Sequence, residues 1–255
     1  MSSLHQDSLP ALRIGDHDFT WGSRTYVMGV VNATPDSFSG DGILPDPGDI
    51  QGAVDQALRM EDEGADIIDV GGESSRPRSV YPDARPVSPD DEISRVVPII
   101  EALVGRLAVP ISIDTRKASV ASAAIAAGVV LANDVSMLAD PAMAEVVADL
   151  DVPIVVSHIR PGGHRSDVVE DVLSDLGSAI ATLTGAGVDR SSVIADPGIG
   201  FAKTAPQSIV LVATIARLRK ELALPVLVGT SRKSFIGAVT GDPVESRLFG
   251  TAASL

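Results

Sequence analysis

Short runs of Val, Ile and Leu alternate along the chain with longer segments that repeat apolar residues at helical spacing. Continuous apolar runs are typical of strands buried on both faces of a parallel sheet. In one of the longer segments Ile209, Val212 and Ile215 recur every three residues, as on one face of a helix. The alternation predicts strands at residues 26–31, 67–70, 111–113, 129–132, 154–157, 192–195 and 226–229, and helices at 49–63, 90–107, 118–127, 142–149, 167–184 and 206–222.

Each of the seven predicted strands is followed by polar or ligand-like residues. Seven strand-then-helix units in succession favour the α/β class and a TIM (β/α)₈ barrel, of which seven units are present in this chain. In such barrels the catalytic face is built from the carboxyl ends of the strands, so the pattern indicates a site as well as a fold. The residues after the strands are Asn32, Gly71-Gly72-Glu73, Asp114-Thr115, Asn133-Asp134, His158, Asp196 and Ser231-Arg232-Lys233.

A single domain spanning residues 1–255 is expected, because 255 residues is a usual size for one such barrel and no linker divides the chain. Within the N-terminal segment 1–25, residues 12–21 alternate apolar and polar around Gly15-Asp16-His17. This alternation predicts a β-hairpin that plugs the bottom of the barrel.

Composition excludes several classes of function. The formal net charge of −14 argues against nucleic-acid binding, which needs a basic field, and the lack of cysteine excludes disulfides and thiolate metal sites. The four histidines show no zinc-binding spacing, and His158 is as compatible with a structural role as with a functional one. No membrane-length apolar run and no signal-peptide pattern occurs, so we expect a cytoplasmic protein that binds no membrane.

Three acid or amide side chains form the sharpest candidate site. Asp114, Asn133 and Asp196 follow the third, fourth and sixth strands, so they can converge on one ligand in the barrel mouth. Asp and Asn together suit a heterocycle with adjacent N–H donors and acceptors, such as an aminopyrimidinone ring. The alternative is a structural network among the strands.

Three loops carry further candidate chemistry, each with a plain alternative. The Gly71–Pro77 loop (71–77) offers two glycines, hydroxyls and the guanidinium of Arg76 to an oxyanion, or is a flexible loop with a solvated arginine. Lys233 and its neighbours lie where barrels often bind phosphate, or form a solvated basic turn. The polar segment after Asn32 is either functional or simple turn chemistry around Pro35. With Lys203 and Arg232, these cations can make the site locally positive.

Six sequence blocks in this order resemble those of the dihydropteroate synthase family, the pterin-binding enzymes of folate synthesis. The blocks are NATPDSFS, GADIIDVGGESSRP, ISIDT, NDVS, DPGIGFAK and LVGTSRKSFIG, and the resemblance runs from Tyr26 to the last residue. It implies a TIM barrel that joins 6-hydroxymethyl-7,8-dihydropterin diphosphate to 4-aminobenzoate and releases diphosphate, with Mg²⁺ as cofactor. The implied partners are these small molecules, with a homodimer in the full-length family.

The resemblance also implies a role for each matching residue. Asp114, Asn133, Asp196 and Lys233 would hold the pterin ring, and Asp114, Asp196 and Lys233 would be the catalytic residues. Asn32 would meet the metal and the diphosphate. Ser75 and Arg76 would lie near the diphosphate and the aminobenzoate, while Phe38, Pro77 and Ser234 would shape the aminobenzoate pocket.

The sequence departs from the family pattern at four places. The acid of the first loop is displaced in Ser39-Gly40-Asp41-Gly42, Arg78 replaces a glycine, and Ser157-His158 replaces Met-His. The family's eighth strand, with an Arg-x-His that grips the diphosphate, has no counterpart before Leu255. We therefore expect open sheet edges, low stability and little synthase activity in this chain. A pterin-binding homologue without synthase activity and a pterin-dependent methyltransferase remain alternatives.

Overall fold

The computed structural model describes residues 9–33, 50–73, 87–160, 162–163 and 167–255. Its main feature is a parallel sheet of six strands in which neighbours in sequence are neighbours in space. The six strands predicted first along the chain are confirmed to within two residues at each end. They are β3 (Met28–Asn32), β4 (Ile67–Gly71), β5 (Ile111–Asp114), β6 (Leu131–Asp134), β7 (Ile154–Ser157) and β8 (Val193–Asp196).

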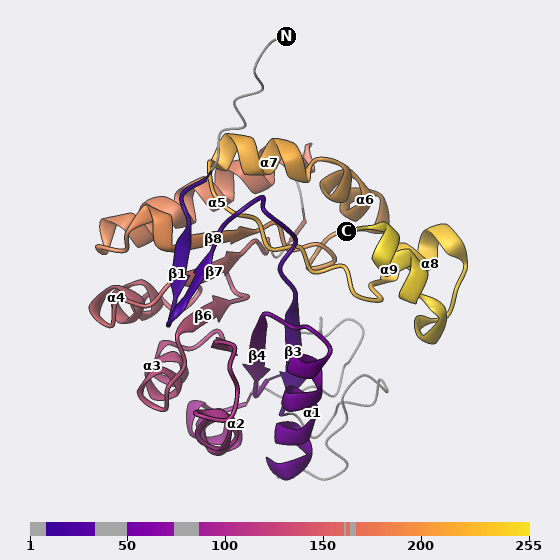
Figure 1. Cartoon of the computed structure of the whole chain (residues 1–255). Helices are drawn as coiled ribbons and strands as arrows, with labels where there is room; N and C mark the ends of the chain where they lie inside the picture. Colours follow the sequence, from indigo (N-terminus) through magenta and orange to yellow (C-terminus); the bar gives the residue numbers. More distant parts are fainter. Residues whose placement is uncertain (1–8, 34–49, 74–86, 161, 164–166) are drawn as a thin grey trace.

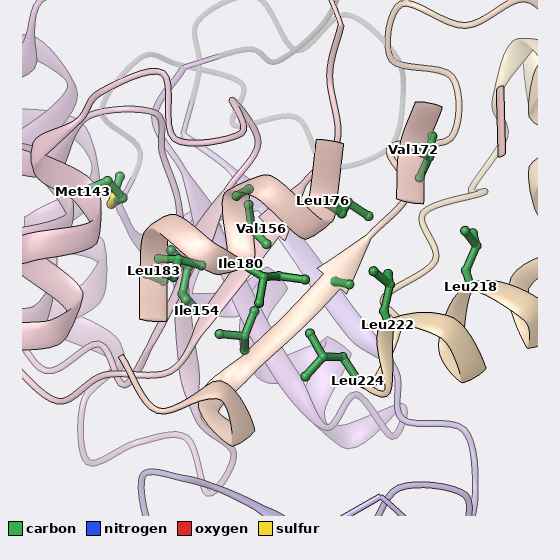
Figure 2. Close-up of a cluster of buried hydrophobic side chains, with 14 of the residues drawn as sticks. Met143, Ile154, Val156, Val172, Leu176, Ile180, Leu183, Leu218, Leu222 and Leu224 are labelled. Carbon is green, nitrogen blue, oxygen red and sulfur yellow. The ribbon is translucent and has the colours of Figure 1, made fainter. Parts of the chain in front are cut away.

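Helices follow the strands and cover the outer face of the sheet, and Figure 1 shows them around the outside of the curved set of strands. Side chains such as Ile154 and Val156 of β7 point outward and pack against Leu176 and Ile180 (Figure 2). The helices are α1 (Ile50–Asp62), α2 (Pro89–Leu103), α3 (Ala118–Ala126), α4 (Ala142–Asp149), α5 (Val168–Gly185), α6 (Ala205–Ala213), α7 (Ile215–Leu222), α8 (Ser234–Thr240) and α9 (Leu248–Ala253), with short 3₁₀ turns η1 (Arg190–Ser192) and η2 (Val244–Ser246).

The N-terminal hairpin fills the amino-terminal end of the inner face. Strands β1 (Leu12–Ile14) and β2 (His17–Phe19) pair in antiparallel register, and Gly15 takes a positive φ of 59° at the turn between them. Their buried side chains, including the fully buried Ile14, form one cluster with inward-facing residues of four barrel strands. The hairpin is therefore the plug that the sequence predicts. The strand residues of this cluster are Ile67, Leu131, Val155 and Ile194.

The prediction of a seventh regular strand at residues 226–229 is wrong. Residues 226–229 make one parallel bridge, between Val226 and Ala195, supported by the Leu227 amide donating to the Ala195 carbonyl at 2.9 Å. The pairing goes no further, and within the described part of the chain no strand lies on the other side of this segment. Its side chains are accordingly only partly buried.

The predicted helix 206–222 is two helices that meet at Thr214. The Thr214 hydroxyl donates to the Val210 carbonyl at 2.8 Å, and its backbone leaves the helical range at φ −113° and ψ 11°. Helix α6 therefore ends, and α7 starts, at this residue. The apolar spacing alone gives no sign of this break.

Candidate active site

Three of the predicted site residues lie at one level across the carboxyl end of the sheet. The register pairs Asn32 with Gly71, Gly71 with Asp114, and Asp114 with Asn133. Paired residues of parallel strands point to the same face, so Asn32, Asp114 and Asn133 share the inner face that the hairpin plugs from below. Gly71 between them leaves room, because a side chain there would stand against Asp114.

Asp196 joins this face from the other side of the barrel. Asn133 pairs with Val155, and Ser157, two residues further along β7, pairs with Asp196. Since side chains alternate along a strand, Val155, Ser157 and Asp196 point to the same face as Asn133. Figure 1 shows β7 and β8 across the curved sheet from β3 and β4.

Burial and neighbouring charges perturb Asp114. The pKa of its carboxyl is well above the usual value, first because burial penalises the charged form, and then because Asp69 and Glu92 place negative charge nearby. Arg116 opposes this shift. Asp114 therefore keeps its proton to a higher pH than a free aspartic acid does.

Asn133 is fixed by a buried acid that the sequence reasoning did not single out. Its Nδ2 donates to Oδ2 of Asp69 at 2.9 Å, and both side chains are buried. Burial raises the pKa of Asp69, while bonds from Ser112 and Asn133 lower it. The sequence does contain a signal for Asp69, because it is an acid within the otherwise apolar run Ile67–Gly71. It stands two residues before Gly71, and this spacing puts its side chain on the inner face.

Asp196 has both carboxylate oxygens engaged. Ser157 donates from Oγ to Oδ2 at 2.9 Å, and the Gly198 amide donates to Oδ1 at 2.7 Å. Gly198 has a positive φ of 64°, and a Cβ there would lie 1.9 Å from the His158 carbonyl oxygen. The turn after β8 thus fixes the orientation of Asp196, and Ser157, at a point of departure from the family pattern, takes part in it.

Lys233 stands at the start of α8 with its ammonium directed at the loop after β8. Its Nζ donates to the Ile199 carbonyl and lies 4.4 Å from the centre of the Phe201 ring. Burial lowers the pKa of Lys233, and the charge of Asp196 opposes that shift. The structure therefore brings Lys233 to the Asp196 side of the site, while Ser234 lies exposed on the first turn of α8.

An ion-pair cluster holds the end of β4 to the segment after β5. Lys117 bonds both to the fully buried Glu92 of α2 and to Glu73, the latter at 2.6 Å. Arg116 also pairs with Glu73, at 2.7 Å, and Thr115 donates to Glu92 at 2.7 Å. Glu73, Glu92, Thr115 and Arg116 line a small hollow beside the site together with Asp114. The cluster fixes the side chain of Glu73, which follows β4.

Four predicted site residues, namely Phe38, Ser75, Arg76 and Pro77, lie outside the described residues. The same holds for Asp41 and Arg78, two of the departures from the family pattern. Their predicted roles stay predictions.

The family resemblance implies a metal-binding role for Asn32, which lies among the described residues. In the described ranges no group of three or more His, Asp or Glu side chains could hold a metal ion. A single amide oxygen nevertheless fits Mg²⁺, because this ion keeps several waters and is often bound by one or two protein groups together with substrate phosphates. Asn32, half-buried at the end of β3, fits a site that a bound diphosphate would complete.

The fold and the inner-face residues define a barrel enzyme whose polar site lies at the carboxyl ends of the strands. The sequence model of the pterin-binding enzymes matches residues 28–255, so the chain belongs to that family. The chain is 46% identical to the dihydropteroate synthase of Clostridium beijerinckii over 95% of its own length and 87% of that protein, and 46% identical to that of Bacillus subtilis over 91% and 79%.

Solved structures of dihydropteroate synthase share the fold. The enzyme of Xanthomonas albilineans with 4-aminobenzoic acid superposes with a TM-score of 0.86 at 42% identity, covering 97% of this chain and 88% of that one. The same enzyme in complex with 7,8-dihydropteroate gives a TM-score of 0.82 at 41% identity, with 96% and 87% covered. The fold class is the TIM barrel, as the strand-then-helix cadence predicts. Of the helices described, none is long and apolar enough to cross a membrane.

Proposed function

We propose that this chain is a dihydropteroate synthase that joins 6-hydroxymethyl-7,8-dihydropterin diphosphate to 4-aminobenzoate, giving 7,8-dihydropteroate and diphosphate. The observation that carries the proposal is the set of Asp114, Asn133 and Asp196 on one inner face, with Lys233 beside them, in a chain that belongs to the pterin-binding enzymes. Relatives of the same name, 41–46% identical and covering most of the chain, support the same reaction.

The inner-face residues suit the pterin ring. Asp196 is oriented by Ser157 and Gly198 and can accept from the ring's amino and N–H groups, while the free Oδ1 of Asn133 offers a second acceptor. Asp114 lies on the same face and offers its carboxyl to the ring nitrogens. As the bond to the diphosphate breaks, positive charge spreads from the exocyclic methylene into the ring, and acidic groups around it stabilise that charge.

The diphosphate end of the substrate would lie toward β3. Asn32 would share Mg²⁺ with the phosphates, and Ser75 and Arg76 would bind phosphate oxygens by hydrogen bonds and a charged fork. The metal, when bound, would neutralise charge that develops on the leaving diphosphate. The protein's part in this step is to hold the leaving group in line with the methylene carbon.

The aminobenzoate would enter from the side of α8. Ser234 is exposed at the start of that helix, and Phe38 and Pro77 would complete an apolar wall. An arylamine is neutral at pH 7, so its nitrogen can attack the methylene without a strong general base. The arrangement works by positioning and charge stabilisation rather than through a covalent intermediate.

Turnover of the pterin diphosphate with 4-aminobenzoate tests the proposal. The purified chain should form 7,8-dihydropteroate and release one diphosphate per product, with both dependent on 4-aminobenzoate and on Mg²⁺. Pterin binding without product would favour a binding homologue. Methyl transfer to or from a pterin, with no use of 4-aminobenzoate, would replace the proposal by the methyltransferase alternative.

A further inference from the structure

Lys203, in the loop after β8, directs its ammonium at four acceptors. Its Nζ lies 2.9 Å from the Gly198 carbonyl oxygen, 3.1 Å from that of Phe201 and 3.2 Å from that of His158. Nδ1 of His158 lies 3.0 Å from the same nitrogen. An ammonium has three N–H bonds, so it fits this set of acceptors far better than a neutral amine, which has two.

His158 continues the contact toward α5. Its side chain is fully buried, and its Nε2 lies 3.0 Å from Oδ2 of Asp175. Because the ammonium of Lys203 can only donate, Nδ1 accepts and the ring proton is on Nε2, which donates to Asp175. Arg160 holds Asp175 through two bonds, at 2.8 and 2.6 Å. A continuous series of polar contacts therefore joins the loop after β8 to α5, which contacts β7.

The loop after β8 contacts both Asp196 and Lys233, the two charged residues on this side of the site. The Gly198 amide orients Asp196, and the Ile199 carbonyl accepts from Lys233. The Phe201 ring lies under the Lys233 ammonium. Lys203 binds the carbonyls of Gly198 and Phe201, on either side of Ile199, and fastens them to the end of β7 at His158.

We propose that Lys203 is a positioning residue for pterin binding: its ammonium fastens the loop after β8 to the end of β7 and so sets the positions of Asp196 and Lys233. The inference rests on the proposed function for the identity of the ligand. It goes beyond that function by making pterin affinity depend on the protonation of a residue that does not contact the ring.

The surroundings of Lys203 determine how pterin affinity should change with pH. The pKa of Lys203 is lowered to about 8, chiefly by burial and in smaller part by Lys233, while Asp196 and Asp175 oppose the shift. Among the described residues, His158 also faces Lys203, through its Nδ1. Lys203 thus loses its proton as the pH rises through about 8, and pterin affinity falls there because the loop is no longer fastened.

The absence of cysteine from the chain allows a sharp test. The Lys203→Cys protein, alkylated in the unfolded state with 2-bromoethylamine, regains an ammonium on a side chain of lysine length. Alkylation with 1-bromopropane gives the same number of heavy atoms without the charge. Lys220→Cys, at an exposed position on α7, receives both treatments as the matched control.

Calorimetric titration with 6-hydroxymethylpterin at about pH 7 should show near-native affinity for the aminoethyl protein. The propyl protein should bind on the order of tenfold to hundredfold more weakly, as expected for lost charge-assisted bonds. The two Lys220→Cys derivatives should bind alike. Equal affinity of the two Lys203→Cys derivatives would overturn the proposal.

Pterin affinity measured over a series of pH values distinguishes a positioning role of Lys203 from an effect on folding. The wild type and the aminoethyl protein are compared at temperatures where both are folded. The thioether sulfur lowers the basicity of the new amine, so the fall in pterin affinity should move to lower pH in the aminoethyl protein and stay in place in the Lys220→Cys control. An unmoved fall would overturn the role of Lys203. If the wild type bound no pterin at any pH, the proposed function would fail instead.

Discussion

The inner-face acids are the residues at which binding and stability oppose each other. Asp69 and Asp114 lie close together beneath the barrel mouth, and burial raises the pKa of both. A raised pKa means that the folded state favours the protonated acid, so the stability that these groups contribute is lost as the pH rises from the unfolded pKa through the folded one. Such strained titratable groups are typical of sites kept for function rather than for stability.

Replacing Asp114 with Asn should therefore stabilise the fold and impair the site. Asn keeps the shape of the acid but cannot ionise, so the melting temperature at about pH 7 should rise, while pterin binding should weaken by about 1–3 kcal/mol. Calorimetry gives both values, and Asp16→Asn, whose side chain is 97% exposed, is the control. A lower melting temperature, or unchanged binding, would contradict this assignment of Asp114.

At the residue scale the sequence predicts which residues end the strands but not what fixes them. Asp114, Asn133 and Asp196 could be placed together because the carboxyl ends of parallel strands share one edge. The partners that orient them, Asp69 for Asn133 and Ser157 for Asp196, lie 64 and 39 residues away in the chain. No local pattern encodes such pairs.

At the scale of elements, the turn after β8 determines much of the geometry of the site. It holds Asp196, carries the carbonyl that Lys233 meets, and passes so close to β7 that only a glycine fits at position 198. The backbone there also has a positive φ, which disfavours any residue with a Cβ. Position 198 is therefore constrained twice, by conformation and by contact.

Gly198→Ala should cost on the order of 2 kcal/mol of unfolding free energy and displace Asp196 and Lys233, so pterin binding should fall as well. The control is Gly177→Ala in α5, where a Cβ would meet nothing within 4 Å and should stabilise the helix by about 0.5–1 kcal/mol. Urea titrations measure both free energies. If Gly198→Ala were as stable as Gly177→Ala, the close approach to His158 would be wrong.

The predicted elements fail where a tertiary contact decides the outcome. The six regular strands agree with their apolar runs, whereas the run at 226–229 makes only a single bridge, to Ala195. The apolar spacing of 206–222 is helical throughout, yet Thr214 divides it. The hairpin was predictable because its alternation and Gly15 are local signals.

At the scale of the whole molecule, the sheet curves around its polar inner face but has an open edge. Among the described residues β3 pairs only with β4, and Val30 on its inner face is 40% exposed. Apolar side chains are also exposed on α8 and α9, where Phe249 is 85% exposed. Cover for these edges and side chains by an eighth strand and helix stays a prediction, as does its effect on stability and turnover.

The proposed function places the pterin on the inner face, at the carboxyl ends of the strands. The measurement that tests it most directly is the calorimetric affinity for 6-hydroxymethylpterin of the wild type, of Asp196→Asn and of the exposed control Asp16→Asn. Asn keeps the volume of Asp196 and removes its charge. If the pterin binds there, Asp196→Asn should bind it about 1–3 kcal/mol more weakly, while Asp16→Asn should match the wild type. Equal affinity in all three proteins would contradict it and place the pterin elsewhere.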